Sequence, residues 1–321
     1  MPVLRESSYG KPLIARFPHL HTIVAAKIRR ESRPPWIRER IDTPDGDFLD
    51  IDVWVAGRDQ AVILQHGLEG SSERTYMRGM ARALFEAGFD VLAVNFRGCS
   101  GEPNRMPRSY HSGATEDLRA VLDHFDGRYA RFGAVGFSLG GNMLLKYLRE
   151  EGEQSRIASA VAVSVPCDLE GSADRLAEPS NRLYMWNFMR SLRKKVQQKA
   201  AQFPERISTE SLDEMRTFHE FDDRYTAPLH GYRDAQDYWT RCSGRGFIEH
   251  ICVPTLLLNA QDDPFFSESC FPVEACAASD HVTLEMPPVG GHVGFLQGLR
   301  NGRRTYAEER AAEFLTGAGQ G

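Results

Sequence analysis

Short apolar stretches alternate with longer amphipathic segments through most of the 321-residue chain. Bounded apolar runs predict buried strands, and apolar residues three or four positions apart predict helices. The predicted strands are residues 61–65, 89–96, 132–136, 158–165, 255–259 and 282–286. The predicted helices are residues 72–87, 113–125, 140–149, 267–278 and 306–315. Strands that alternate with helices predict an α/β fold whose mostly parallel sheet is covered on both faces.

An antiparallel hairpin is predicted before the first of those strands. Residues 38–42 and 48–55 alternate apolar and polar positions, which is typical of strands with one covered face. The turn sequence Pro44-Asp45-Gly46-Asp47 separates them. The hairpin therefore adds two N-terminal strands to the sheet.

The alternation stops between residues 168 and 246. This segment is polar, charge-rich and helical in pattern, and aromatic residues are spread through it. We interpret it as a helical cap inserted after residues 158–165, which form the sixth predicted strand when the two hairpin strands are counted. Trp186 is a candidate residue of the substrate-pocket wall. Its basic stretch, residues 190–199, is interpreted as a solvated helix face rather than a lipid-headgroup contact. Residues 36–167 and 247–316 then form the core, and residues 1–35 an N-terminal segment packed on it.

Composition narrows the functional classes. A formal net charge of −5 argues against general nucleic-acid binding, because there is no basic excess to neutralise phosphates. Six scattered cysteines without a CxxC pair are typical of reduced thiols. Residues 1–26 hold no apolar signal-peptide core, and no run approaches the roughly 18 apolar residues of a membrane span. We therefore expect a cytoplasmic protein without a transmembrane segment, a metal or a cofactor.

The run Gly136-Phe137-Ser138-Leu139-Gly140 lies between a predicted strand and a predicted helix. Gly-x-Ser-x-Gly in that context is typical of a nucleophile elbow. The turn is so tight that the serine adopts a strained backbone conformation, and glycines on both sides avoid steric clashes. We predict Ser138 as the nucleophile.

A serine hydroxyl needs a base, and the base needs a carboxylate that fixes its tautomer. In this kind of fold the chain order is Ser, then Asp or Glu, then His, each on a loop after a strand. His292 follows the last predicted strand between glycines, so it is the predicted base. Asp263 is the preferred acid after residues 255–259. Asp262 is kept as an alternative and Asp168 as a more distant one.

The negative oxygen that forms during acyl transfer needs two backbone N–H donors. Leu139, directly after the nucleophile, is predicted to supply one of them. The loop His66-Gly67-Leu68-Glu69-Gly70 follows a predicted strand, and Leu68 is predicted to supply the other.

Several of these segments together resemble one family. They are Pro18-His19-Leu20-His21-Thr22, His66-Gly67-Leu68-Glu69-Gly70, Asn95-Phe96-Arg97-Gly98, Gly136-Phe137-Ser138-Leu139-Gly140, Asp262-Asp263-Pro264 and Gly291-His292. The chain resembles the YheT-like, or AB-hydrolase 4, branch of the α/β-hydrolase superfamily over nearly its whole length. The resemblance implies a serine esterase, and some eukaryotic relatives act on acylglycerols or phospholipids. Those relatives usually carry an N-terminal membrane helix, which the sequence lacks.

The predicted function is hydrolysis of carboxylic esters through an acyl-enzyme on Ser138, Asp263 and His292. The substrates are small-molecule esters with short to medium acyl chains, or acylglycerol and other lipid esters. A thioesterase or peptidase on the same triad is the alternative. A non-catalytic binding protein is a weaker one, because all three triad residues are present. The sequence leaves the acyl length and the oligomeric state open.

Overall fold

A computed structural model describes residues 3–4, 7–10, 12–298 and 304–317 of the chain. Its strands form one sheet in the order β1-β9-β8-β7-β6-β4-β5-β3-β2. The strands are β1 (Val3–Leu4), β2 (Ile37–Asp42), β3 (Phe48–Trp54), β4 (Gln60–Gln65), β5 (Asp90–Asn95), β6 (Arg131–Phe137), β7 (Ile157–Val163), β8 (Thr255–Leu258) and β9 (Val282–Glu285).

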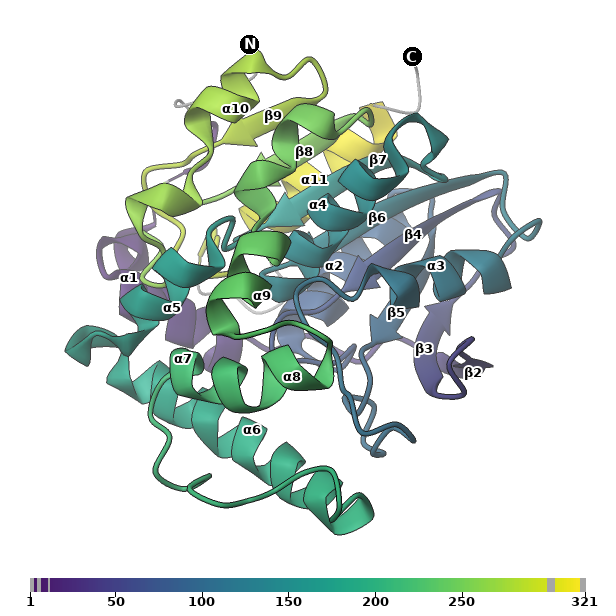
Figure 1. Ribbon diagram of the computed structural model, residues 1–321. Helices are drawn as coiled ribbons and strands as arrows, with labels where there is room; N and C mark the ends of the chain where they lie inside the picture. Colours follow the sequence, from purple (N-terminus) through teal and green to yellow (C-terminus); the bar gives the residue numbers. More distant parts are fainter. Residues whose placement is uncertain (1–2, 5–6, 11, 299–303, 318–321) are drawn as a thin grey trace.

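The helices cover the sheet on both sides (Figure 1). They are α1 (Pro18–Ile23), α2 (Thr75–Glu86), α3 (Thr115–His124), α4 (Leu139–Glu151), α5 (Leu169–Ala177), α6 (Arg182–Gln202), α7 (Phe218–Phe221), α8 (Ala227–Leu229), α9 (Ala235–Cys242), α10 (Val273–Ala278) and α11 (Tyr306–Gly317). None of the helices in these described parts is long and apolar enough to cross a membrane.

The predicted sheet is confirmed, including its antiparallel edge. β2 pairs with β3 and β3 with β5 in antiparallel fashion, and the other pairs are parallel. The strand β1 was not predicted, because two residues along β9 are too short for any periodicity to show.

Alternate residues of the central strands point to opposite faces, as the two-residue period of a strand requires. Ile63 of β4 packs in the layer that contains α3 and α4. Its neighbours Val62 and Leu64 pack against α2 and α11 on the other face. Because both faces are covered, the central strands are apolar with few exceptions, such as Ser159 of β7, which explains the nearly continuous apolar runs in the sequence.

Two regions differ from the predicted helices. Residues 267–278 are not one helix: a 3₁₀ turn, Glu268–Cys270, comes before the separate α10. Pro272 lies between them and restricts the conformation of Phe271, so the helix cannot continue. The N-terminal segment forms α1 and a π-helical turn, Val24–Ile28, which the strand and helix pattern did not predict.

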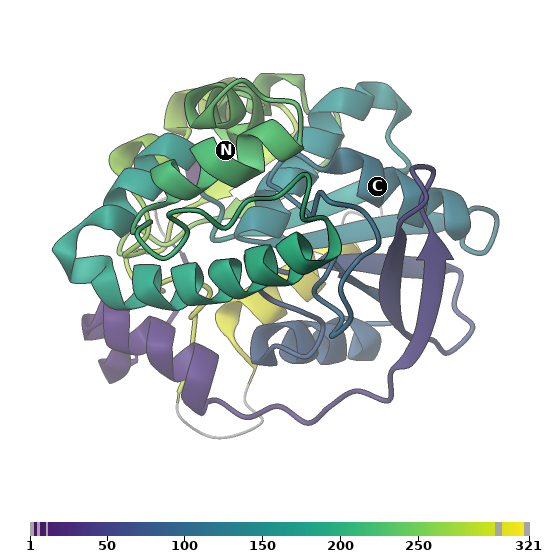
Figure 2. The same ribbon diagram turned by 60° about the horizontal axis from the view of Figure 1, so that its bottom comes forward.

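Helices α5 to α9 follow β7, the sixth of the predicted strands, and gather on one side of the molecule (Figures 1 and 2). Their apolar side chains form two clusters, and Phe265 and Phe266 of the core contribute to the larger one. The helical content of the predicted cap is therefore confirmed. Its exact domain boundaries stay a prediction.

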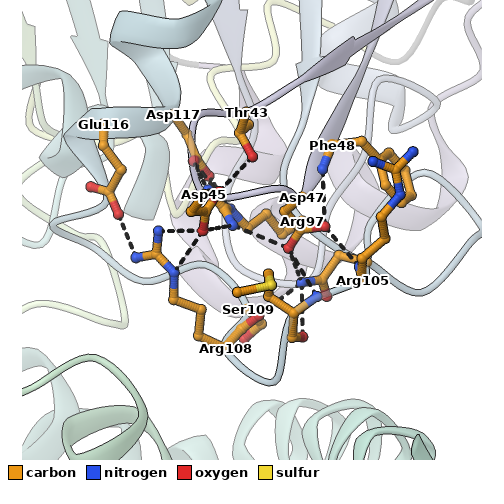
Figure 3. A network of polar contacts seen from close by, with 12 residues as sticks. Thr43, Asp45, Asp47, Phe48, Arg97, Arg105, Arg108, Ser109, Glu116 and Asp117 are labelled. Carbon is orange, nitrogen blue, oxygen red and sulfur yellow. Dashed lines mark hydrogen bonds and ion pairs between the residues drawn. The ribbon is translucent and has the colours of Figure 1, made fainter.

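A buried ion-pair network fixes the long loop between β5 and α3 (Figure 3). Arg97 is 2% exposed and contacts Asp45 and Asp47 of the hairpin turn and Asp117 of α3. Asp47 also accepts a hydrogen bond from Asn104 Nδ2 at 2.6 Å. Breaking such a network leaves buried charges unpaired, so it holds the loop firmly beside the cap.

Candidate active site

Ser138 lies at the turn from β6 into α4, as the elbow motif predicts. Its backbone has φ 51° and ψ −119°, a conformation that L-residues rarely adopt. A Cβ on Gly136 would lie 2.6 Å from the Gly140 carbonyl oxygen, and one on Gly140 would lie 2.5 Å from that of His66. Both glycines are therefore required by the close approach of backbone segments at this turn.

Three side chains from separate loops meet above the carboxyl ends of the strands. Ser138 Oγ lies 3.1 Å from His292 Nε2, and His292 Nδ1 lies 2.8 Å from Asp263 Oδ2. The other oxygen of Asp263 accepts the Phe265 N–H at 2.9 Å. Since a carboxylate only accepts, His292 carries its proton on Nδ1 and Nε2 is free to take the serine proton.

The alternative acids lie elsewhere. Asp262 Oδ1 accepts the Gly291 N–H at 2.9 Å, so this carboxylate holds the loop of His292 rather than its ring. Burial raises the pKa of Asp262. Asp168 pairs with Arg245 at 2.9 Å. Of the three acids that the sequence offered, only Asp263 contacts the imidazole of His292.

Leu68 and Leu139, the predicted oxyanion donors, both line the cavity above Ser138. Within the part of the chain that the structure describes, neither backbone N–H donates to another protein group. Leu139 opens α4, where backbone N–H groups lack partners within the helix. Both amides are thus free to bind a negative oxygen.

The loop that carries Leu68 is held by neighbouring aromatic rings. Tyr76 OH accepts the Gly67 N–H at 3.0 Å, and Tyr110 OH accepts the Glu69 N–H at 2.7 Å. His66 Nε2 accepts the Phe96 N–H, so its Nδ1–H donates to the Gly67 carbonyl at 2.7 Å. Complete burial lowers the pKa of His66 to about 3, which keeps this ring neutral.

The N-terminal segment supports the loop of His292, a role that sequence reasoning missed. Thr22 Oγ1 accepts the His292 N–H at 2.9 Å, and Ser164 Oγ accepts the Val293 N–H at 2.9 Å. A Cβ on Gly291 would lie 2.7 Å from Thr22 Oγ1. The motif that contains Thr22 was the signal available, but no spacing rule joins it to a residue 270 positions away.

His21, next to Thr22, ties the same segment to the end of that loop. It is fully buried, and its Nε2 accepts the Leu296 N–H at 3.0 Å. Burial lowers the pKa of His21 to about 4. The unfolded chain binds a proton near pH 6.5, so this contribution to stability is complete above that pH and declines as the pH falls toward 4.

We expect urea unfolding to show this decline as a midpoint that falls between pH 6.5 and pH 4. The variant His21→Gln, whose amide oxygen can still accept from Leu296 but does not titrate, should show a shallower decline. Equal pH dependence in the two proteins would contradict the assignment to His21.

A cavity of ≈ 370 Å³ opens above Ser138 and His292. Its walls combine apolar side chains of the cap, including Leu176, Phe188, Leu192 and Phe218, with residues of the core and the N-terminal segment. The prediction that Trp186 forms part of the cavity wall is wrong, because this residue is 55% exposed and does not line the cavity. Along α6 it points away from the side that carries Phe188. The described residues contain no cluster of His, Cys, Asp or Glu that could hold a metal ion.

The basic stretch on α6 does not lie on a single solvated face. Lys195 Nζ lies 2.7 Å from Glu69 Oε1, directly beside the loop of Leu68. Lys199 is 8% exposed and donates to the carbonyl oxygens of Asn104 and Met106. These two lysines fasten the cap to the core at the cavity wall, whereas Arg190 and Lys194 face solvent.

Comparison with known proteins agrees with this architecture. The family of the alpha/beta hydrolase fold matches residues 60–299. The chain is 37% identical to YheT of Escherichia coli (strain K12), to which an esterase activity is ascribed, over 93% of this chain and 90% of that protein. It is 32% identical to the phospholipase ABHD3 of Mus musculus, over 88% of this chain and 72% of the mouse protein.

Solved structures extend the likeness of the fold. The esterase Pf2001 of Pyrococcus furiosus is similar with a TM-score of 0.57 over 87% of this chain and 91% of that one, at 20% identity. At that identity the likeness shows the fold alone. Together with the matched family and the relatives above 30% identity, the chain belongs to the α/β-hydrolase superfamily and to its YheT-like branch.

Proposed function

We propose that this chain hydrolyses carboxylic esters through an acyl-enzyme formed on Ser138. Its family places it among esterase- and lipase-type hydrolases. The observation that carries the finer proposal is the hydrogen-bonded series Ser138–His292–Asp263 at the floor of an apolar cavity. A nucleophile, an oriented base and a place for an acyl chain are the parts that ester hydrolysis requires.

In the proposed reaction His292 Nε2 takes the Ser138 proton while Oγ attacks the ester carbonyl carbon. The Leu68 and Leu139 N–H groups bind the resulting negative oxygen, and Asp263 stabilises the imidazolium. His292 then gives its proton to the leaving alcohol. Water attacks the acyl-enzyme with His292 again as the base, which releases the acid and restores Ser138.

The cavity supports an acyl group as the part of the substrate that is recognised. Its apolar lining comes from the cap on one side and from the core and the N-terminal segment on the other, so the acyl chain lies between the cap and the core, beside the loop of Leu68. The substrate class that fits is an ester of a short to medium acyl chain, a lipid ester included. The expected cytoplasmic location stays a prediction.

A labelled fluorophosphonate, followed by p-nitrophenyl esters of increasing acyl length, tests this function. We expect labelling of the wild-type protein and hydrolysis that improves with length until the cavity is filled. A matched thioester and a matched amide separate the alternative reactions. No labelling and no ester hydrolysis, or faster cleavage of the amide or thioester, would overturn the proposal.

Replacing Phe188 with alanine is expected to change the preferred acyl length. Its ring lies 6.2 Å from that of Phe265 at the cavity wall. Loss of apolar contacts to an acyl chain should lower kcat/KM on longer esters by roughly 10- to 200-fold. Activity on an acetyl ester should change less than about tenfold, since the oxyanion donors are untouched.

The matched control is Trp186→Ala, which removes an aromatic ring from the exposed side of the same helix. Its acyl-length profile should equal that of the wild type. If Phe188→Ala lowered activity equally on all esters, the ring would support the fold rather than contact the substrate.

A further inference from the structure

Large exposed apolar side chains are concentrated on two helical segments. Of the eight that the described residues present, six lie on residues 13–28 and on α6. These six, which we call the mouth face, are Leu13, Phe17, Leu20, Ile28, Leu183 and Trp186. Soluble domains rarely gather such side chains without a partner, and a gathered patch marks an interaction site.

The two segments of the mouth face lie side by side (Figure 2). The ring of His19 stacks on that of Tyr184 with centroids 5.8 Å apart, and Tyr184 OH donates to the His19 carbonyl at 3.3 Å. Phe17 and Leu20 lie within two residues of His19 in the chain, and Leu183 directly precedes Tyr184. The two segments that carry the exposed apolar side chains are therefore neighbours.

The cavity above Ser138 reaches the surface beside this face. Ala26 and Lys27 of the N-terminal segment are exposed and line the cavity, and so does Asn187 of α6. Asn187 directly follows Trp186 in the chain. A molecule that entered here would pass the mouth face before it reached Ser138.

The charged side chains on the two segments of the mouth face are all basic. Residues 12–30 and α6 contain no Asp or Glu. Their exposed basic side chains, none with an ion-pair partner among the described residues, are Arg16, Lys27, Arg30, Arg182, Arg190 and Lys194. This contrasts with the net charge of −5 for the whole chain.

On α6 two apolar side chains and then two basic ones follow one another along one stripe. Leu183, Trp186, Arg190 and Lys194 follow one another at three- and four-residue spacing, so they share a helix face. The Arg190 guanidinium lies over the Trp186 ring, 5.2 Å from its centroid. A tryptophan with aliphatic and basic neighbours matches the boundary between lipid headgroups and acyl chains.

We infer that the mouth face docks on a lipid surface that carries anionic headgroups, so that ester substrates enter the cavity from that surface. Apolar side chains insert below the headgroups while the basic ones contact phosphates, which is the arrangement of peripheral helices that lie in the interface. Docking itself stands apart from the proposed function. Only the statement that the entering molecules are esters rests on it.

Co-sedimentation of the full chain with vesicles tests this inference. One set contains phosphatidylcholine with about a third of phosphatidylglycerol, and the other phosphatidylcholine alone. We expect tighter binding to the anionic set, weakened by salt. The variant Leu183→Glu/Trp186→Glu should bind at least about tenfold more weakly, and Arg190→Gln/Lys194→Gln should show a weaker preference for anionic vesicles.

The matched control is Ile37→Glu/Val55→Glu. These two are the remaining large exposed apolar residues of the described chain and lie at the sheet edge formed by β2 and β3, away from α1 (Figure 1). They should leave vesicle binding unchanged. All variants should hydrolyse a water-soluble acetyl ester at close to the wild-type rate, because none touches Ser138 or its partners.

Three results would overturn the inference. They are no binding of the wild type to either vesicle set, equal weakening by the control variant, or a wild-type dimer that Leu183→Glu/Trp186→Glu converts to a monomer. The last would assign the face to a second copy of the chain. If the wild-type protein did not hydrolyse the acetyl ester, the proposed function would be refuted instead. Vesicle binding would then be judged on its own results.

Discussion

Replacing Ser138 with alanine is expected to abolish ester hydrolysis and fluorophosphonate labelling, with a loss in kcat of roughly 10³- to 10⁶-fold. The hydroxyl that hydrogen-bonds to His292 is then gone, while the backbone turn needs no side-chain oxygen. Alanine has the same Cβ as serine, so the strained conformation at φ 51° is no worse and the fold should persist. Circular dichroism and the unfolding midpoint check that persistence.

The matched control is Ser191→Ala, which removes a hydroxyl from the wall of the same cavity. It should keep full labelling. His292→Ala should cost about as much as Ser138→Ala, and the double variant little more, because triad members act as one unit. Additive losses, or labelling that survives in Ser138→Ala, would assign the nucleophile to another residue.

The second large effect is expected from Asp263→Asn, with a loss in kcat of about 10⁴-fold on a p-nitrophenyl ester. An asparagine whose carbonyl oxygen keeps the Phe265 N–H would turn its NH₂ group toward His292 Nδ1. The imidazole would then carry its proton on Nε2, facing Ser138, and could no longer accept the serine proton.

Asp262→Asn makes the same chemical change one residue away. Its amide oxygen can still accept the Gly291 N–H, so we expect a loss of less than about tenfold. The reverse ranking of the two variants would transfer the role of the acid to Asp262.

Local patterns predicted the parts of the fold that depend on local causes. The runs that became β4, β6 and β7 are apolar because helices cover both faces of the sheet. The elbow around Ser138 was recognised because its serine and glycines are near in sequence, although Gly140 is also required by the approach of the distant His66 carbonyl oxygen. The hairpin was predicted correctly because its turn residues and the alternation of apolar and polar positions both indicate two paired strands.

The features of the site that could not be predicted from the sequence depend on contacts between distant segments. Both Asp262 and Asp263 contact the loop 29 residues further on, and the choice between them follows from which carboxylate meets the imidazole rather than the backbone. Trp186 and Phe188 are both aromatic, and only the packing of α6 decides which of them faces the cavity. The inward direction of Lys195 depends in the same way on Glu69, which lies far from it in the chain. The break in the helix predicted over residues 267–278 is different, because Pro272 is visible in the sequence and the prediction overlooked it.

The hydrogen bond from the His292 N–H to Thr22 has a consequence for how the protein is made. Tyr9 also bonds the Leu296 carbonyl, and Arg29 pairs with Glu308, so both ends of the chain meet around one loop. During synthesis the N-terminal segment emerges first, and the partners Leu296 and Glu308 follow 287 residues after Tyr9 and 279 residues after Arg29. A growing chain that has not reached residue 292 therefore lacks the base, and these contacts of the N-terminal segment form only after His292, Leu296 and Glu308 have been made.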